Sequence, residues 1–260
     1  MMRMEWITAR SYRLRMVLSF VTLLLAVVPV YFIGRALDPT MAASISTEGG
    51  DYFGFLVLGV AVVPLVAAAA GTLPAAIASG IGTGTLETQL CTPIGLPALV
   101  AGLCGYSLAW GALRAALVVL LGVALGMHIA WSGLALGMVI VLLTVLAYLP
   151  VGLVAGALVL RFRTAAELPK LAVYASVFLG GVYYPTSVIP TWIRHLADVV
   201  PISFGLRALR RVLLQDASVS SVVGDVGALA LSVAVTTVIG MYALRSALRH
   251  VRQAGTTGQY

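Results

Sequence analysis

Long apolar runs constrain this chain more than any other feature of its sequence. Crossing a bilayer core of about 30 Å takes roughly 20 apolar residues in a helix, and five or six stretches qualify. We place them at 15–36, 53–78, 96–127, 132–160, 168–184 and 222–246. The fifth is the weakest, because Pro169 lies near its start and Gly180 near its end. The runs are continuously apolar, whereas barrel strands alternate, so the pattern predicts an all-α polytopic membrane protein with six transmembrane helices.

Composition excludes the soluble alternative. Hydrophobic residues make up 61% of the chain and charged residues 10%, whereas a soluble domain is about one quarter charged. A soluble protein of this length could not bury so much apolar surface. We therefore expect residues 1–260 to form a single transmembrane domain without a second, soluble one.

Basic residues near the ends of the runs predict orientation. With a cytoplasmic N-terminus, ten Lys and Arg residues lie inside and five outside, which fits the positive-inside rule. The inner ones are Arg3, Arg10, Arg13, Arg15, Arg161, Arg163, Lys170, Arg245, Arg249 and Arg252. The outer ones are Arg35, Arg194, Arg207, Arg210 and Arg211, beside the acids Asp38, Glu48, Asp51, Asp198, Asp216 and Asp225. Both termini are thus predicted in the cytoplasm. The net charge of +7 is explained by this topology and by contact with anionic lipid, so it does not indicate nucleic-acid binding.

The N-terminal segment 1–14 allows two interpretations. Trp6 and Ile7 stand among several arginines, so the segment could lie in the interface as an amphipathic helix. The same arginines could instead act only as topological anchors. A cleaved signal peptide is disfavoured, because the apolar run from Val17 to Gly34 exceeds the usual length of about 7–15 residues.

A short polar patch, "GTGTLETQLCTPIG" at 82–95, interrupts the apolar sequence on the predicted inner side. Its carboxylate, Glu87, is the only acidic residue between Asp51 and Glu167. Thr85 can cap a short helix with Glu87 in its first turn, and Pro93 would end that helix. The patch therefore predicts a short cytoplasmic helix suited to docking a partner, with a plain connecting turn as the alternative.

The predicted outer segment 185–221 is broken by Pro185, Pro190 and Pro201, so no single helix can run through it. After Pro201 the spacing predicts an amphipathic helix at the outer interface. One face would carry Leu206, Leu209 and Leu213, and the other would present Arg207, Arg210 and Arg211 to headgroups or water. Tyr183, Tyr184 and Trp192 suit the same interfacial depth.

Two motifs together resemble those of ABC-2-type transporter permeases. The run "GTLETQLCTPIGLPALVAG" is similar to the element after the second span in that family, and "GGVYYPTSVIPTWIRHLADVVPISFGLRALRRVL" is similar to the segment after the fifth. The resemblance covers essentially the whole chain. It implies that 82–95 is a coupling helix docked on a separate ATP-binding subunit, and that 1–14 is an elbow helix. The matching coupling positions are Gly84, Thr85, Leu86, Glu87, Thr92 and Pro93.

The resemblance also implies re-entrant or interfacial external helices between the fifth and sixth spans. They would close the outer end of the pathway with Tyr183, Tyr184, Pro185, Pro190, Trp192 and Pro201. One departure concerns the coupling region, where "SGIGT" at 79–83 replaces the charged residues that often precede this motif in the family. Docking there is expected to be weaker, more flexible or specialised to one partner.

No nucleotide site is encoded in this chain. Lys170 is its only lysine and lacks the Gly-rich lead-in of a P-loop, so ATP and Mg would have to be bound by a partner. The resemblance then implies the permease subunit of an exporter in a bacterial plasma membrane, paired with an identical or related permease. Its apolar walls favour outward movement of a hydrophobic or amphiphilic substrate, such as a drug, an antibiotic or a lipid.

Two other functions stay open at this point. An ion-driven secondary transporter would need acids near the middle of a span, and none of the nine acids lies there. An intramembrane enzyme could use His195 and Asp198, but no nucleophile motif accompanies them. Arg114 is the one charge deep within a span, so we expect it to face protein or a wet cavity, as a pathway residue or a subunit contact.

Overall fold

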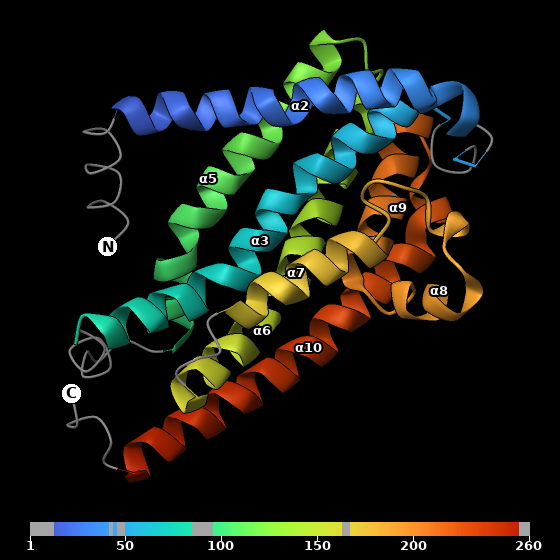
Figure 1. Ribbon diagram of the computed structural model, residues 1–260. Helices are drawn as coiled ribbons and strands as arrows, with labels where there is room; N and C mark the ends of the chain where they lie inside the picture. The colour runs from blue at the N-terminus through green and yellow to red at the C-terminus, as the bar shows by residue number, and fades with distance from the viewer. Residues whose placement is uncertain (1–12, 42–43, 46–49, 85–95, 163–166, 255–260) are drawn as a thin grey trace.

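Figure 1 shows the computed structural model of the chain, a bundle of helices. The structure describes residues 13–41, 44–45, 50–84, 96–162 and 167–254, and every regular element within these ranges is a helix. The α-helices are α2 (Arg13–Met41), α3 (Tyr52–Gly82), α5 (Leu96–Ala124), α6 (Leu134–Phe162), α7 (Leu168–Leu179), α8 (Thr191–Ala197), α9 (Pro201–Gln215) and α10 (Val219–Ala254). Two short 3-10 helices, η2 (Trp131–Gly133) and η4 (Thr186–Val188), lie in the connections. The all-α polytopic fold predicted from the apolar runs is confirmed, and five of the described helices are long and apolar enough to cross a membrane.

Helix α3 is the central element of the bundle. It begins at an N-cap, Asp51, whose carboxylate accepts hydrogen bonds from the N–H groups of Phe53 and Gly54 at 3.2 Å. Along its 31 residues it packs against α2, α5, α6 and α7, and most of its side chains are buried. Its last turn ends at Thr83, whose N–H donates to Ser79 O, and the chain then turns through Gly84 with a φ of +69°.

The neighbours of α3 approach it closely through glycine. A Cβ built on Gly152 of α6 would lie 2.9 Å from Ala69 O and 3.0 Å from Ala70 O, so any larger residue there would push α6 away. On the α5 side, a Cβ on Gly111 would lie 3.4 Å from Pro64 O. Small residues thus let backbones meet along α3, as expected where helices associate by packing within lipid.

The two ends of the bundle differ in charge. At one end, which we call the α9 end, the Tyr52 N–H donates to Asp38 at 2.9 Å and the Ala130 N–H donates to Leu213 O at 2.8 Å. At the opposite end, Ile77 of α3 packs in a cluster with Leu153 and Leu244. Among the described residues, the α9 end carries both signs in equal number, since Asp38, Asp51, Asp198, Asp216 and Asp225 lie there with Arg35, Arg194, Arg207, Arg210 and Arg211. The opposite end is mainly basic, with Arg13, Arg15, Lys170, Arg245 and Arg249 against Glu167. This distribution fits a cytoplasmic opposite end, on the left of Figure 1, where α3 and α10 finish. Sidedness itself stays a prediction.

The prediction of a fifth span over 168–184 is wrong in its length. Helix α7 has 12 residues, about 18 Å at 1.5 Å per residue, against a bilayer core of about 30 Å. It ends at Gly180, which passes so close to α9 that a Cβ there would lie 2.2 Å from Ile202 Cγ2. Gly181 then takes a φ of +70°, which turns the chain toward η4. The number of complete crossings therefore stays a prediction.

Most residues of helix α9 are buried, so it is not an exposed helix on the surface of the bundle. It packs against α3, α6, α7 and α10, with Leu206, Leu209 and Leu213 in the core as their spacing predicts. A Cβ on Gly205 would lie 2.2 Å from Thr144 Oγ1 of α6, so the two helices meet there with no space between them.

The outward faces of α2 and α10 are apolar. Leu25 and Phe32 of α2 and Val238 and Tyr242 of α10 are exposed in the isolated chain. Such surfaces are stable where lipid or another apolar partner covers them, which agrees with the membrane class predicted from composition.

Candidate functional site

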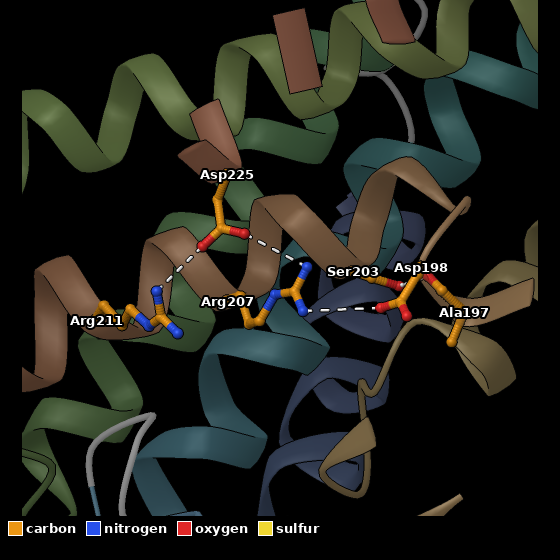
Figure 2. A network of polar contacts seen from close by, with 6 residues as sticks. All are labelled: Ala197, Asp198, Ser203, Arg207, Arg211 and Asp225. Carbon is orange, nitrogen blue, oxygen red and sulfur yellow. Dashed lines mark hydrogen bonds and ion pairs between the residues drawn. The ribbon is translucent and has the colours of Figure 1, made fainter. Parts of the chain in front are cut away.

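Figure 2 shows a charged network at the α9 end that joins α9 to α10. Asp225 of α10 lies between two arginines of α9, with its Oδ1 3.4 Å from Arg207 Nη2 and its Oδ2 3.3 Å from Arg211 Nη1. The side chain of Asp225 is 14% exposed, and those of Arg207 and Arg211 are 26% and 32% exposed. The partial burial of all three groups makes these ion pairs stronger than ordinary surface pairs, though still open to screening by salt.

The same network extends to α8. Arg207 Nη1 lies 3.8 Å from Asp198 at the end of α8, and the Ser203 hydroxyl donates to Ala197 O at 2.7 Å. The second contact is buried and satisfies a carbonyl at the C-terminus of α8. These contacts fix α8 against the start of α9, so the segment 191–215 forms one unit, which we call the α8–α9 segment.

Arg210 corrects the sequence-based placement of the three arginines. Instead of facing headgroups or water it is 2% exposed, with its guanidinium 3.3 Å from the centre of the Phe55 ring. Its Nη2 donates to Phe55 O at 3.0 Å and to Val182 O at 3.2 Å. Gly59 leaves room for these contacts, because a Cβ there would lie 2.4 Å from Val182 O. Arg210 thus connects α9 to α3 and to the turn that follows α7.

The residues that the resemblance places at an external gate lie at the α9 end, between α7 and α9. The side chain of Tyr183 is exposed, and its carbonyl accepts a hydrogen bond from the Tyr52 hydroxyl at 2.7 Å. The Tyr184 hydroxyl donates a hydrogen bond to Phe178 O. Burial raises the pKa of the Tyr184 phenol, so this group stays a neutral donor. Pro185 is buried, Pro190 is exposed just before α8, Trp192 on α8 is 73% exposed, and Pro201 begins α9. Their function as a gate stays a prediction.

Most of the proposed coupling residues lie outside the described residues. Thr85, Leu86, Glu87, Thr92 and Pro93 all fall within 85–95, and the elbow segment falls largely within 1–12. Gly84 is described and stands directly after the end of α3, at the end of the bundle opposite α9. A structure at 85–95 would therefore be attached to the most buried long helix of the bundle.

Comparison with known families decides the identity of the bundle. The family model described as "ABC-2 type transporter" matches residues 10–214, well over half of the chain. The chain belongs to the ABC-2 type transporter family. Members are membrane subunits of transporters that work with an ATP-binding cassette subunit, and this permease is a multi-pass protein of the bacterial plasma membrane.

Two kinds of curated relatives are similar to this ABC-2 permease. Nodulation protein J of Rhizobium leguminosarum bv. trifolii is 28% identical over 225 residues, which cover 84% of this chain and 83% of that protein. Nodulation protein J of Bradyrhizobium diazoefficiens is 29% identical over 175 residues, or 65% of this chain and 64% of that protein. Linearmycin resistance permease protein LnrN of Bacillus subtilis is 27% identical over 118 residues, which cover 45% of this chain but 31% of LnrN.

Arg114 lies on α5 of the permease, half-buried, with its guanidinium 5.7 Å from the centre of the Trp110 ring one turn earlier. The ring attracts the guanidinium, and this attraction is stronger where the side chain is partly removed from water. Its predicted function in the pathway or at a subunit contact is not tested by this placement.

Sequence reasoning missed the partners of the arginines on α9. Phe55 and Gly59 lie more than 150 residues before Arg210 in the chain, and nothing in their local sequence marks them as its contacts. Asp225 was recognised only as one of several outer acids. A signal was present, since Asp225 is an acid one turn and a half into an apolar helix, where a charge needs a partner.

Replacing Asp225 with asparagine should loosen α9 from α10. Two half-buried arginines would lose their counter-charge, and we expect the free energy of unfolding to fall by about 1–2 kcal/mol, more than for an exposed pair. The measurement is the thermal melting of the detergent-solubilised permease, at low salt and at about 1 M salt, where screening should shrink the difference.

The matched control is Asp198→Asn, since Asp198 is 50% exposed and 3.8 Å from Arg207. Its effect should stay below about 0.5 kcal/mol. Equal melting of the D225N variant and the unchanged protein would contradict a stabilising network.

Proposed function

We propose that this chain is the membrane-spanning permease subunit of an ABC exporter. It moves a hydrophobic or amphiphilic substrate outward, and a separate nucleotide-binding subunit binds ATP and Mg and hydrolyses the ATP. The observation that carries the proposal is the ABC-2 family membership of a chain whose central helix, α3, leads directly into the segment 85–95. Gly84 and the first three residues of that segment form the Gly-Thr-Leu-Glu sequence that matches the coupling position of the family.

The proposed transporter contains two permeases, identical or related, and two ATP-binding subunits. Substrate moves between the two membrane halves, and the α8–α9 segment closes the outer end of that path. Exposed apolar faces on α2 and α10 give a second permease and lipid ample surface to cover. The similarity to a linearmycin resistance permease supports an antibiotic or another amphiphile as the substrate class.

Isolation of the permease from its native membrane tests this function. The wild-type chain, purified in mild detergent, should bring an ATP-binding subunit that intact-mass spectrometry identifies. Replacing Glu87 with alanine removes the one carboxylate of the coupling segment, and with it a charge-assisted hydrogen bond or a helix cap. Recovery of the ATP-binding subunit should then fall about tenfold.

Glu167→Ala is the matched control, since Glu167 is an exposed acid at the same end of the bundle that pairs with Lys170 at 2.8 Å. It should leave recovery unchanged. If the wild-type chain is purified without an ATP-binding subunit under conditions that preserve membrane complexes, the proposed coupling to an ATPase is contradicted. Equal losses of the ATP-binding subunit from E87A and E167A would contradict a specific function of Glu87 in binding it.

A further inference from the structure

We propose that Arg210 is the positioning residue that makes α3 and the α8–α9 segment move together. A displacement of the Gly84 end of α3, produced by the ATP-binding subunit, would reach the outer end of the path through this side chain, in addition to the apolar packing of α9 on α3 and the Tyr52–Tyr183 hydrogen bond. The inference rests on the proposed function and adds to it the route from the coupling segment to the α9 end. It concerns the contact at Phe55, Gly59 and Val182.

The contact is rigid because of its chemistry. The planar guanidinium of Arg210 donates to Phe55 O from both Nε, at 3.3 Å, and Nη2, at 3.0 Å. Nη2 also donates to Val182 O, and the face of the guanidinium lies on the Phe55 ring. A side chain held by two backbone carbonyls and a ring cannot slide along α3 without losing buried hydrogen bonds.

Helix α3 can carry a displacement over the whole depth of the bundle. Phe55 lies in its first turn and Gly84 follows its last, which places them about 43 Å apart along the helix axis at 1.5 Å per residue. Pro64 and Pro74 each remove one backbone hydrogen bond within this length. Close packing against Gly111 of α5 and Gly152 of α6 supports the helix near these points.

The other polar contacts of α9 point elsewhere. Arg207 and Arg211 bind Asp225 of α10, and Ser203 binds the end of α8. Arg210 is therefore the arginine of α9 whose hydrogen bonds are directed at α3, while Arg207 and Arg211 keep α8, α9 and α10 together. Removing its donors should leave the α8–α9 segment folded but separate its movement from that of α3.

The test follows the α9 end while the ATP-binding subunit works. In protein whose two native cysteines are replaced, V199C puts a thiol at the junction of α8 and α9, where Val199 is 74% exposed. The probe is a membrane-impermeant maleimide, and its reaction rate is compared between the nucleotide-free complex and the vanadate-trapped complex in nanodiscs. We expect a clear nucleotide-dependent change in the unchanged complex. In R210M this change should be at least about fivefold smaller, the lower end of common coupling effects, while ATP hydrolysis per complex continues.

Three further variants make the result specific. R210K keeps the charge and one donor group, so it should restore part of the response that R210M loses. G59A leaves Arg210 in place but puts a methyl group 2.4 Å from Val182 O, so it should weaken the response even if R210M assembles poorly. R35M is the matched control, because Arg35 also contacts Phe53 of α3 at the α9 end but belongs to α2. It should behave like the unchanged complex.

The possible results separate this inference from the proposed function. A full nucleotide response in both R210M and G59A would overturn the positioning function of Arg210. Parallel losses of subunit binding, ATP hydrolysis and nucleotide response in these variants would also overturn it. That pattern is expected if Arg210 only stabilises the fold. Absence of an ATP-binding subunit, or of any response in the unchanged complex, would overturn the proposed function and with it this inference.

Discussion

Replacing Arg210 with alanine should lower the melting temperature of the permease on the order of 10 °C, corresponding to a loss of about 3–5 kcal/mol. The substitution removes the donors to Phe55 O and Val182 O and empties the volume beside the Phe55 ring. The Val182 carbonyl stands in a turn, so loss of its donor leaves a buried acceptor unsatisfied. Tryptophan fluorescence during heating of the detergent-solubilised chain measures the effect.

Arg211→Ala is the control for this experiment. Arg211 lies one position further along α9, but it is partly exposed and pairs with Asp225, so its removal should cost about 1 kcal/mol. The two adjacent arginines should therefore differ several-fold in their effect on melting. Equal shifts would mean that the buried position of Arg210 contributes nothing beyond its charge.

Replacing Gly205 with alanine should separate α9 from α6 and destabilise the bundle by about 1–3 kcal/mol. The added Cβ would lie 2.2 Å from Thr144 Oγ1. That hydroxyl donates to Ile140 O at 2.8 Å, which holds the Thr144 side chain in the path of the new methyl group. Thermal melting of the purified chain again gives the measurement.

A double-mutant cycle with Thr144→Ala tests the cause. Removing the hydroxyl and methyl of Thr144 should recover much of the loss, because only its Cβ, 3.2 Å from the new methyl, would remain close. Gly227→Ala on α10 is the matched control, since a Cβ there meets nothing within 4 Å and alanine is the better helix former. If G205A melted like G227A, or if T144A gave no recovery, the close contact of α6 with α9 would be refuted.

The helices of this permease were predictable from sequence because lipid imposes one simple requirement. Each long apolar run must form its own hydrogen bonds, so continuous apolarity predicts a helix without knowledge of its neighbours. The runs at 53–78 and 132–160 accordingly became α3 and α6, within a few residues. For 168–184 the predicted length was wrong, since α7 ends at Gly180 and the chain turns at Gly181, whose φ is +70°.

The placement of Arg210 could have been narrowed further by helical geometry. At about 100° per residue, Arg210 lies about 65° from the centre of the face formed by Leu206, Leu209 and Leu213. By the same geometry Arg207 and Arg211 lie about 125° and 165° away. Arg210 therefore stands at the margin of the buried face. The i, i+3 and i, i+4 spacing of the three arginines suggested one shared face and so hid the difference between Arg210 and the other two. The contact of this margin with Phe55 could not be predicted from the sequence, because it depends on how α9 packs against α3.

The short length of α7 has a consequence for how this chain enters the membrane. A helix of about 18 Å is too short to be held in the bilayer by its own hydropathy. Its buried residues, among them Val173 and Val177, pack in the core cluster that also contains residues of α3 and α6. Helices α3 and α6 leave the ribosome before α7 and can provide this surface during synthesis. Insertion of α7 should therefore follow the order of translation, and a chain that lacked α3 would be expected to leave α7 outside the bilayer.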